Sequence, residues 1–159
     1  MKHSGAWLFK TEPDTFSIDD LKACPQQREI WDGIRNYQAR NFLRDDVQLG
    51  DPVFIYHSSC KNVGIAGLAR VSKTGVADPT QFDPESRYHD PKSSPETPRW
   101  ITVEVEYVET FSEILPLKTI KAMPEITDIG LVKKGHRLSI MPVNGDEFEA
   151  LLNAARAAR

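Results

Sequence analysis

A regular alternation of apolar and polar side chains runs through residues 100–107 and constrains the fold more than any other feature of this sequence. Its period of two is that of an antiparallel strand with one buried face and one solvated face. We expect the buried face to hold Ile101, Val103, Val105 and Tyr107, and the solvated face to hold Thr102, Glu104 and Glu106. The chain therefore builds at least part of its core on an antiparallel sheet.

Further strands and a smaller number of helices are expected along the chain. Short apolar or aromatic runs predict strands at 6–11, 52–57, 64–71 and 137–143. Helical spacing and capping residues predict helices from Ser17 and over 36–45, 116–123 and 144–158. Because the two kinds of element do not alternate strictly, a doubly wound parallel sheet is disfavoured. We predict an α+β fold, a mixed, mostly antiparallel curved sheet or small barrel with peripheral helices.

Length and composition favour an ordinary globular chain. At 159 residues, with 40% hydrophobic side chains, we expect one domain over 1–159 with a core of its own. No apolar run approaches the roughly 20 residues of a membrane span, and the first residues lack the apolar stretch of a secretory signal. Two cysteines are too few for a disulfide scaffold. We therefore expect a cytoplasmic protein without a membrane partner.

The charge balance argues against extended binding of nucleic acid. The formal net charge is −3, whereas proteins that neutralise many phosphates are usually basic. Residues 1–75 carry a net charge of +1 and residues 76–159 one of −4. The sequence therefore permits a small site facing one or two phosphates, with a shallow salt dependence.

A proline-rich stretch predicts a long irregular loop over 78–98. It holds Pro79, Pro84, Pro91, Pro95 and Pro98, which block regular helix and central strand. A loop of this length inside a compact domain more often has a function than not. Its aromatic side chains Phe82 and Tyr88 suggest a lid over a pocket, or they simply anchor the loop.

The densest group of chemically versatile side chains lies in residues 30–44. Helical spacing places Ala39, Phe42 and Leu43 on a core-facing side. Three arginines beside Trp31 and Tyr37 suit an anionic, planar ligand, because arginine grips phosphate and an aromatic ring stacks on a base. A purely structural alternative stays open: Asn36 caps the helix, Trp31 is core, and the arginines pair with Asp32, Asp45 and Asp46.

A second polar cluster follows the strand at 52–57. Tyr56, His57 and Ser58 lie where a strand end meets a cleft, so we expect them to line a pocket. His57 and Cys60 show no third group that would orient them as base and nucleophile. The cysteines and histidines lack the spacing of a zinc site. We assign no catalytic residue, metal ligand or cofactor. Gly64 and Gly67 are expected to allow a bulge or a close backbone approach.

Several segments together resemble the EVE domain family, and the resemblance covers about residues 5–155. The most specific run is Trp31-Asp32-Gly33-Ile34-Arg35-Asn36-Tyr37-Gln38-Ala39-Arg40-Asn41. The others, in the family's order, are Trp7–Pro13, Tyr56–Ser58, Gly64–Gly67, Phe82–Pro84, Tyr88–Ser93 and Arg137–Val143. The resemblance implies the PUA-like pseudobarrel, which is shared with YTH domains. YTH domains hold a methylated adenine in an aromatic cage.

The resemblance also implies a set of site residues. Lys10 and Trp31 are similar in position to the strand-end lysine and cage tryptophan of YTH domains, and Tyr88 or Phe82 would supply the second wall. The expected nucleotide-binding residues are Lys10, Trp31, Arg35, Asn36, Tyr37, Tyr56, His57, Ser58 and Tyr88. The expected phosphate-binding residues are Arg40 and Arg44.

The function implied by the resemblance is a non-enzymatic module that reads a modified base of DNA or RNA in an aromatic pocket. One alternative is a nuclease, or a hydrolase of a modified nucleoside, with His57, Lys10, Glu12 and Asp90 as candidate acid–base groups. Another is a binder of a free nucleotide or other small metabolite. The sequence names neither the base nor the oligomeric state.

Overall fold

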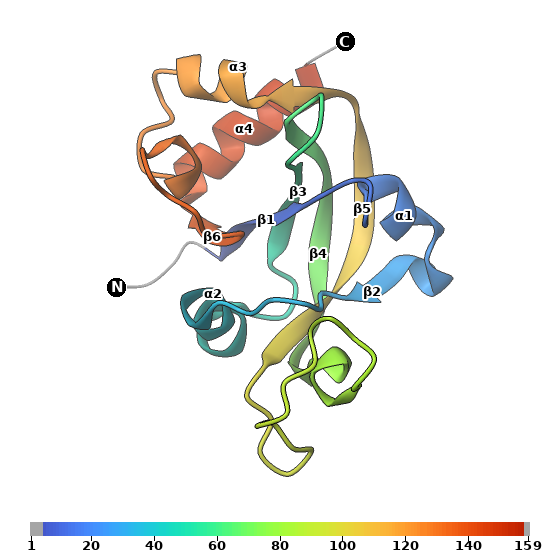
Figure 1. The fold of residues 1–159 in the computed structure, drawn as a ribbon. Coiled ribbons are helices and arrows are strands. Elements are labelled where there is room, and N and C mark those ends of the chain that lie inside the picture. Colours follow the sequence, from blue (N-terminus) through green and yellow to red (C-terminus); the bar gives the residue numbers. More distant parts are fainter. Residues whose placement is uncertain (1–4, 158–159) are drawn as a thin grey trace.

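Six strands form one sheet in the computed structural model, which describes residues 5–157 (Figure 1). Their order is β2-β5-β4-β3-β1-β6. β1 runs parallel to β3, and the other neighbouring strands of the described chain are antiparallel. Because the order ends at β2 and β6, the sheet is not closed. The strands are β1 Ala6–Thr11, β2 Arg28–Ile30, β3 Pro52–His57, β4 Gly64–Ala77, β5 Ile101–Pro116 and β6 Ile140–Val143.

Short helices lie around this sheet and confirm the predicted α+β class. The α-helices are α1 Ile18–Ala23, α2 Tyr37–Asn41, α3 Leu117–Ala122 and α4 Gly145–Ala157. A π-helical turn continues α2 over Phe42–Asp46. Single 3₁₀ turns occupy Pro25–Gln27, Pro79–Phe82 and Gly130–Val132. Most of the helices are too short to be stable alone, so packing against the sheet must support them.

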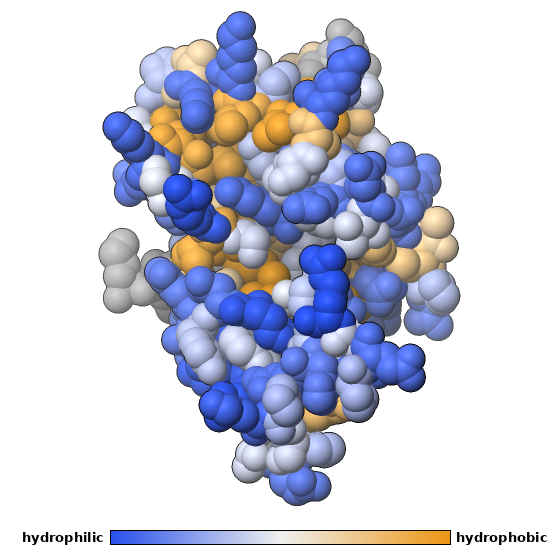
Figure 2. Space-filling view, in the orientation of Figure 1, coloured by the Kyte–Doolittle hydropathy of each residue, from blue (hydrophilic) through white to orange (hydrophobic). Residues whose placement is uncertain are grey.

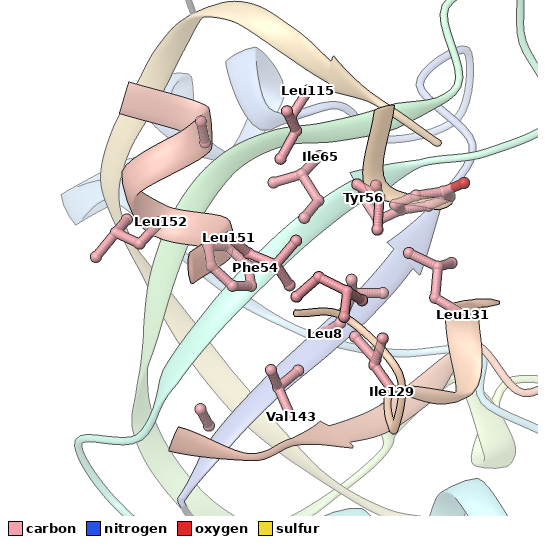
Figure 3. Close-up of a cluster of buried hydrophobic side chains, with 14 of the residues drawn as sticks. Leu8, Phe54, Tyr56, Ile65, Leu115, Ile129, Leu131, Val143, Leu151 and Leu152 are labelled. Carbon is pink, nitrogen blue, oxygen red and sulfur yellow. The ribbon is translucent and has the colours of Figure 1, made fainter. Parts of the chain in front are cut away.

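The sheet buries both of its faces. Along β1, Ala6 and Leu8 point into one hydrophobic cluster, whereas Trp7 and Phe9 point into another, as the period of two requires. The first cluster lies between the sheet and α4, where Leu8, Phe54 and Leu151 meet (Figure 3). The second lies beneath α1, α2 and the segment that contains Trp31.

The long segment between β4 and β5 projects from the end of the sheet opposite to α3 and α4 (Figure 1). On the face shown in Figure 2, hydrophobic residues gather at the α3 and α4 end, whereas the end that carries this segment is mainly hydrophilic. We call residues 78–100 the β4–β5 loop. The predicted irregular structure is found there, apart from the 3₁₀ turn and a bridge between Ser94 and Thr97.

The alternating strand is confirmed but is longer than expected, and one residue of its expected solvated face is buried. Val103 and Val105 are fully buried. Thr102, expected on the solvated face, is only 1% exposed. Its hydroxyl donates a hydrogen bond of 2.5 Å to the carbonyl of Trp31, which covers that face of β5. The prediction for Thr102 was therefore wrong because a loop packs over the strand.

Gly64 and Gly67 in β4 allow the close approach that was expected. A Cβ atom on Gly64 would lie 2.1 Å from the carbonyl oxygen of Leu115, and one on Gly67 would lie 2.5 Å from Ile18. The β4–β5 pairing shifts register between Ile65 and Gly67. These positions therefore serve backbone packing.

The predicted helix over 36–45 is present in two parts. Asn36 caps α2 by accepting a hydrogen bond from the amide of Ala39 at 2.9 Å. Ala39 and Leu43 are fully buried, which confirms the core-facing side. The predicted strand at 137–143 begins only at Ile140, so its first three residues were assigned wrongly.

His57 holds the start of α1 against the end of β3. Its Nε2 accepts a hydrogen bond from the amide of Ile18 at 3.1 Å, and the side chain is 7% exposed. This amide is one of the helix N-terminal donors that lack a partner within the helix. Burial lowers the pKa of His57, although Asp19 and Asp20 oppose the shift. The neutral ring is therefore the form that the fold uses.

Acidification should weaken the fold through His57. A histidine whose pKa is lowered by folding adds stability above the unfolded pKa of about 6.5, and this stability is lost as the pH falls below that value. We expect His57→Gln to reduce the decrease in unfolding free energy between pH 8 and pH 5, by at most about 1.4 kcal/mol per pH unit. Urea unfolding measures this, with His89→Gln as the matched control. If the unfolding free energy of the wild type and of His57→Gln changed equally with pH, His57 would not be the source of the acid sensitivity.

Candidate functional site

A pocket of about 580 Å³ opens where five separate parts of the chain meet. The ends of β1 and β2 form one side, and the residues after β3 and before β6 form another. The β4–β5 loop contributes Arg87 and Tyr88. The lining residues are Lys10, Thr11, Glu12, Thr15, Phe16, Glu29, Ile30, Trp31, Asp32, Gly33, Ile34, Ser58, Ser59, Arg87, Tyr88, Arg137 and Ser139. A pocket of this size accommodates a small planar ligand.

Trp31 is both a pocket wall and a core residue. Its backbone amide donates to the carbonyl of Val103 at 2.9 Å, which continues the β2–β5 pairing by one residue. The indole packs on Phe9 with ring centroids 5.4 Å apart and meets Phe16 edge-on at 6.0 Å. The side chain is 6% exposed. These contacts hold the indole in one position before any ligand arrives.

Tyr88 packs against Gly33 because that position carries no side chain. Gly33 has a φ of +81°, and a Cβ atom there would lie 2.8 Å from the Tyr88 ring. The amide of Gly33 donates to the Asp78 carboxylate at 2.8 Å. The glycine that follows Trp31 and Asp32 therefore lets the loop aromatic approach the wall formed by Trp31.

A salt bridge between Arg35 and Asp78 fixes the base of the β4–β5 loop. Arg35 Nη1 lies 3.0 Å from Asp78 Oδ2, and the Asp78 side chain is 2% exposed. The same guanidinium donates to the carbonyl of Tyr88 from Nε at 3.0 Å and from Nη2 at 2.6 Å. Its donors are thus committed to the protein. Arg35 therefore positions Tyr88.

Cations and aromatic rings alternate along the outer side of this salt bridge. Arg40 lies over Tyr37 at 4.8 Å, and Tyr37 stacks on Trp100 with centroids 4.8 Å apart. Arg35 lies 5.0 Å from the Trp100 ring and 5.6 Å from the Tyr88 ring. Each such contact contributes about 0.5–2 kcal/mol. The series joins α2 to the β4–β5 loop.

The pocket carries charges of both signs. Lys10, Arg87 and Arg137 supply positive charge from three different segments. Glu12, Glu29 and Asp32 supply negative charge. Partial burial lowers the pKa of Lys10. Burial raises the pKa of Asp32, as do Asp78 and Glu29, while Arg35 opposes the shift. The site therefore offers both hydrogen-bond donors and acceptors to a polar, planar ligand.

The structure brings only part of the predicted site together. Lys10, Trp31, Ser58 and Tyr88 line the pocket, whereas Phe82 is not among its lining residues. Arg35 lies outside the pocket and holds Tyr88, whereas Asn36 caps α2. The remaining predicted residues, which do not line the pocket, are Tyr37, Arg40, Arg44, Tyr56 and His57.

Each of these residues has another contact. Tyr56 is 2% exposed in the core, and burial with a smaller contribution from Cys60 raises its pKa to about 12. Arg40 donates to the carbonyl of Arg99 at 2.7 Å. Arg44 pairs with Asp45 at 2.8 Å, as the structural alternative predicted, while Arg35 pairs with Asp78 instead of Asp32.

Several lining residues were missed from the sequence. Phe16, Arg87 and Arg137 lie in loops whose approach to Trp31 depends on tertiary packing. Asp32 could have been predicted as a lining residue from the sequence, since it directly follows the wall residue Trp31. Among the candidate acid–base groups, Lys10 and Glu12 reach the pocket. The carboxylate of Asp90 instead accepts from the Trp100 indole at 2.8 Å.

Within residues 5–157, no three histidine, cysteine, aspartate or glutamate side chains gather so that they could hold a metal ion. In the same range, no helix is long and apolar enough to cross a membrane.

Replacing Asp78 should loosen the pocket and the fold together. Asp78→Asn leaves Arg35 without its carboxylate partner in a largely buried position, which we expect to cost about 3 kcal/mol of unfolding free energy. Chemical unfolding measures the loss. Glu96→Gln, at an exposed position of the same loop, should change stability by less than about 0.5 kcal/mol. Equal stability of the two variants would show that the salt bridge does not anchor the loop.

Known proteins with related sequences and structures share this arrangement of elements. Human thymocyte nuclear protein 1 is 40% identical over 167 residues, covering 94% of this chain and 73% of that protein. A solved Pseudomonas syringae protein is 45% identical with a TM-score of 0.88, covering 93% of this chain and 97% of the other. The crystal structure of human THYN1 protein in complex with 5-methylcytosine containing DNA has a TM-score of 0.87 at 38% identity. This structural match covers 97% of this chain and 99% of the human THYN1 chain.

The model of the EVE domain family matches residues 5–154. This match includes the run Trp31–Asn41 and all of the pocket residues, so it confirms the resemblance found in the sequence. The chain belongs to the EVE domain family.

Proposed function

We propose that this protein binds DNA and reads a modified base, 5-methylcytosine, by taking it into the pocket beside Trp31. The observation that carries the proposal is the aromatic pocket between Trp31 and Tyr88, in a fold that matches human THYN1 in complex with 5-methylcytosine containing DNA over 97% of the chain. A base inside a duplex is reached by such a pocket only if it is flipped out.

The walls suit a flipped base for two reasons. Trp31 is held by Phe9 and Phe16, so little conformational entropy is lost when a base stacks on it. Stacking on an aromatic side chain contributes about 1–3 kcal/mol per base, which compares with the few kcal/mol that flipping costs. Binding therefore depends on polar contacts in the pocket as well.

Phosphate contacts in this proposal come first from the cations that line the pocket. Lys10, Arg87 and Arg137 surround it from three segments. Arg40 and Arg44 lie outside it and stay predicted phosphate contacts for the flanking backbone. A few such contacts agree with the net charge of −3. Binding of RNA or a free nucleotide, a cytoplasmic location and a single domain over 1–159 stay predictions from the sequence.

Removing the aromatic walls should remove the preference for the methylated base. We expect the wild type to bind a duplex with one 5-methylcytosine more tightly than its unmethylated twin. Trp31→Ala should weaken binding of the methylated duplex by roughly 5-fold to 150-fold, because a stacking surface is lost. Fluorescence anisotropy with both duplexes measures this.

Tyr88→Ala provides a second test, since Trp31 also belongs to the core whereas Tyr88 is a partly exposed loop residue. Circular dichroism shows whether each variant is folded. A folded variant that retains the full preference for 5-methylcytosine would contradict the proposal, and so would a wild type that binds both duplexes equally.

The pocket cations should act on both duplexes alike. Arg137→Gln removes a positive charge without touching an aromatic wall, so we expect similar weakening for methylated and unmethylated DNA and a salt slope shallower by about 1. Arg156→Gln, on α4 and paired with Glu109, is the matched control and should leave binding unchanged. An equal effect of the two substitutions would mean that the pocket cations do not face the DNA backbone.

A further inference from the structure

The aromatic walls of a pocket that accepts 5-methylcytosine do not distinguish this base from thymine. Thymine carries the same methyl group at C5 and has a ring of the same shape. The two bases differ at C4, where 5-methylcytosine has an amino group and thymine a carbonyl, and in whether N3 carries a proton. Stacking is tolerant of base identity. Rejecting thymine therefore requires a hydrogen-bond acceptor that faces C4.

Three carboxylates line the pocket, and their availability differs. The Glu29 carboxylate accepts a hydrogen bond from the amide of Ile30 at 3.0 Å and lies 3.9 Å from the Cys24 sulfur. Glu12 and Asp32 are both exposed residues, and within residues 5–157 the Glu12 carboxylate also accepts no hydrogen bond; Glu12 follows β1, whereas Asp32 directly follows the wall residue Trp31. Within residues 5–157, the Asp32 carboxylate accepts no hydrogen bond from another residue. Asp32 is thus a free acceptor in the pocket wall.

The backbone on either side of Asp32 is held firmly. Before it, the Trp31 amide donates to Val103 at 2.9 Å and the Trp31 carbonyl accepts from Thr102 at 2.5 Å. After it, the Gly33 amide donates to the Asp78 carboxylate at 2.8 Å. An aspartate side chain is short, so its carboxylate stays close to this fixed backbone. Asp32 therefore stands between the residue that forms one aromatic wall and the residue against which Tyr88 packs.

We propose that Asp32 is the specificity-determining residue that accepts a hydrogen bond from the C4 amino group of the bound cytosine and excludes thymine. The proposal rests on the reading of 5-methylcytosine argued above. Carboxylates are suited to this amino group. Facing thymine, the same carboxylate meets a carbonyl oxygen, and both acceptors lose their solvation without gaining a bond.

The surroundings of Asp32 strengthen this assignment. Partial burial, Asp78 and Glu29 raise its pKa, whereas Arg35 opposes the shift, so its surroundings as a whole disfavour the negative charge. An amino group that donates to it stabilises that charge. The carboxylate is therefore better matched by a base with an amino group at C4 than by a base with an oxygen there.

The test compares three duplexes in which the target base is 5-methylcytosine, cytosine or thymine. Each target lies opposite an abasic site, so none has a pairing partner to lose when it is flipped. For the wild type we expect 5-methylcytosine to bind roughly 5-fold to 150-fold more tightly than thymine. In Asp32→Asn this ratio should fall close to one, because an amide presents both a donor and an acceptor. Glu96→Gln, at an exposed position outside the pocket lining, is the carboxylate-to-amide control and should keep the wild-type ratio.

The outcomes separate this inference from the function on which it rests. The ratio of 5-methylcytosine to cytosine depends on the methyl group, so Asp32→Asn should leave it unchanged. A wild type without that preference overturns the proposed function and this inference with it. A wild type that prefers 5-methylcytosine, with an unchanged ratio to thymine in Asp32→Asn, overturns the role of Asp32 alone. A wild type that binds thymine as well as 5-methylcytosine also overturns it.

Discussion

The buried carboxylate of Asp78 connects the two segments that form the pocket. One oxygen accepts from the amide and hydroxyl of Thr80, and the other accepts from the Gly33 amide and from Arg35. Arg35 in turn binds the carbonyl of Tyr88. A single charged group thus ties the segment after β2 to the β4–β5 loop. The buried charge requires all of these donors, so the distance between the aromatic walls depends on it.

The arginines of this region therefore have a different role from the one that composition suggests. In the motif Trp31–Asn41, Arg35 is committed to Asp78 and Tyr88, and Arg40 lies over Tyr37. Their planar guanidinium groups pack on rings as well as donating hydrogen bonds. The cations that face the pocket instead come from Lys10, Arg87 and Arg137. A chain with a net charge of −3 can in this way place three cations around the pocket, beside its three carboxylates.

Local pattern predicted most of the strands and helices because each depends on the spacing of its own side chains. Val103 and Val105 in β5, and Ala39 and Leu43 near α2, are buried as their spacing required. The three-residue β2 was missed, since so short a segment carries no periodicity. Thr102 was wrongly expected to be solvated, because the segment around Trp31 that covers it is distant in sequence.

The pocket was predictable only where a residue borders a strand end or belongs to the family motif. Trp31, Lys10 and Ser58 were found in this way. Arg87 and Arg137 lie far apart in sequence, and only the sheet order β3-β1-β6 together with the folded β4–β5 loop brings their segments together. His57 was expected in the pocket, yet its ring accepts from Ile18. Its residue type indicated a polar contact, but only the position of α1 shows which one.

The proposed function requires that a modified base leaves the duplex and enters the pocket beside Trp31. A crystal structure of this protein with a duplex that carries one 5-methylcytosine tests it most directly. We expect the methylated base to be flipped out and stacked on Trp31 opposite Tyr88, with its C4 amino group toward Asp32. A methylated base that remains paired within the duplex, with the pocket facing away from the DNA, would contradict it.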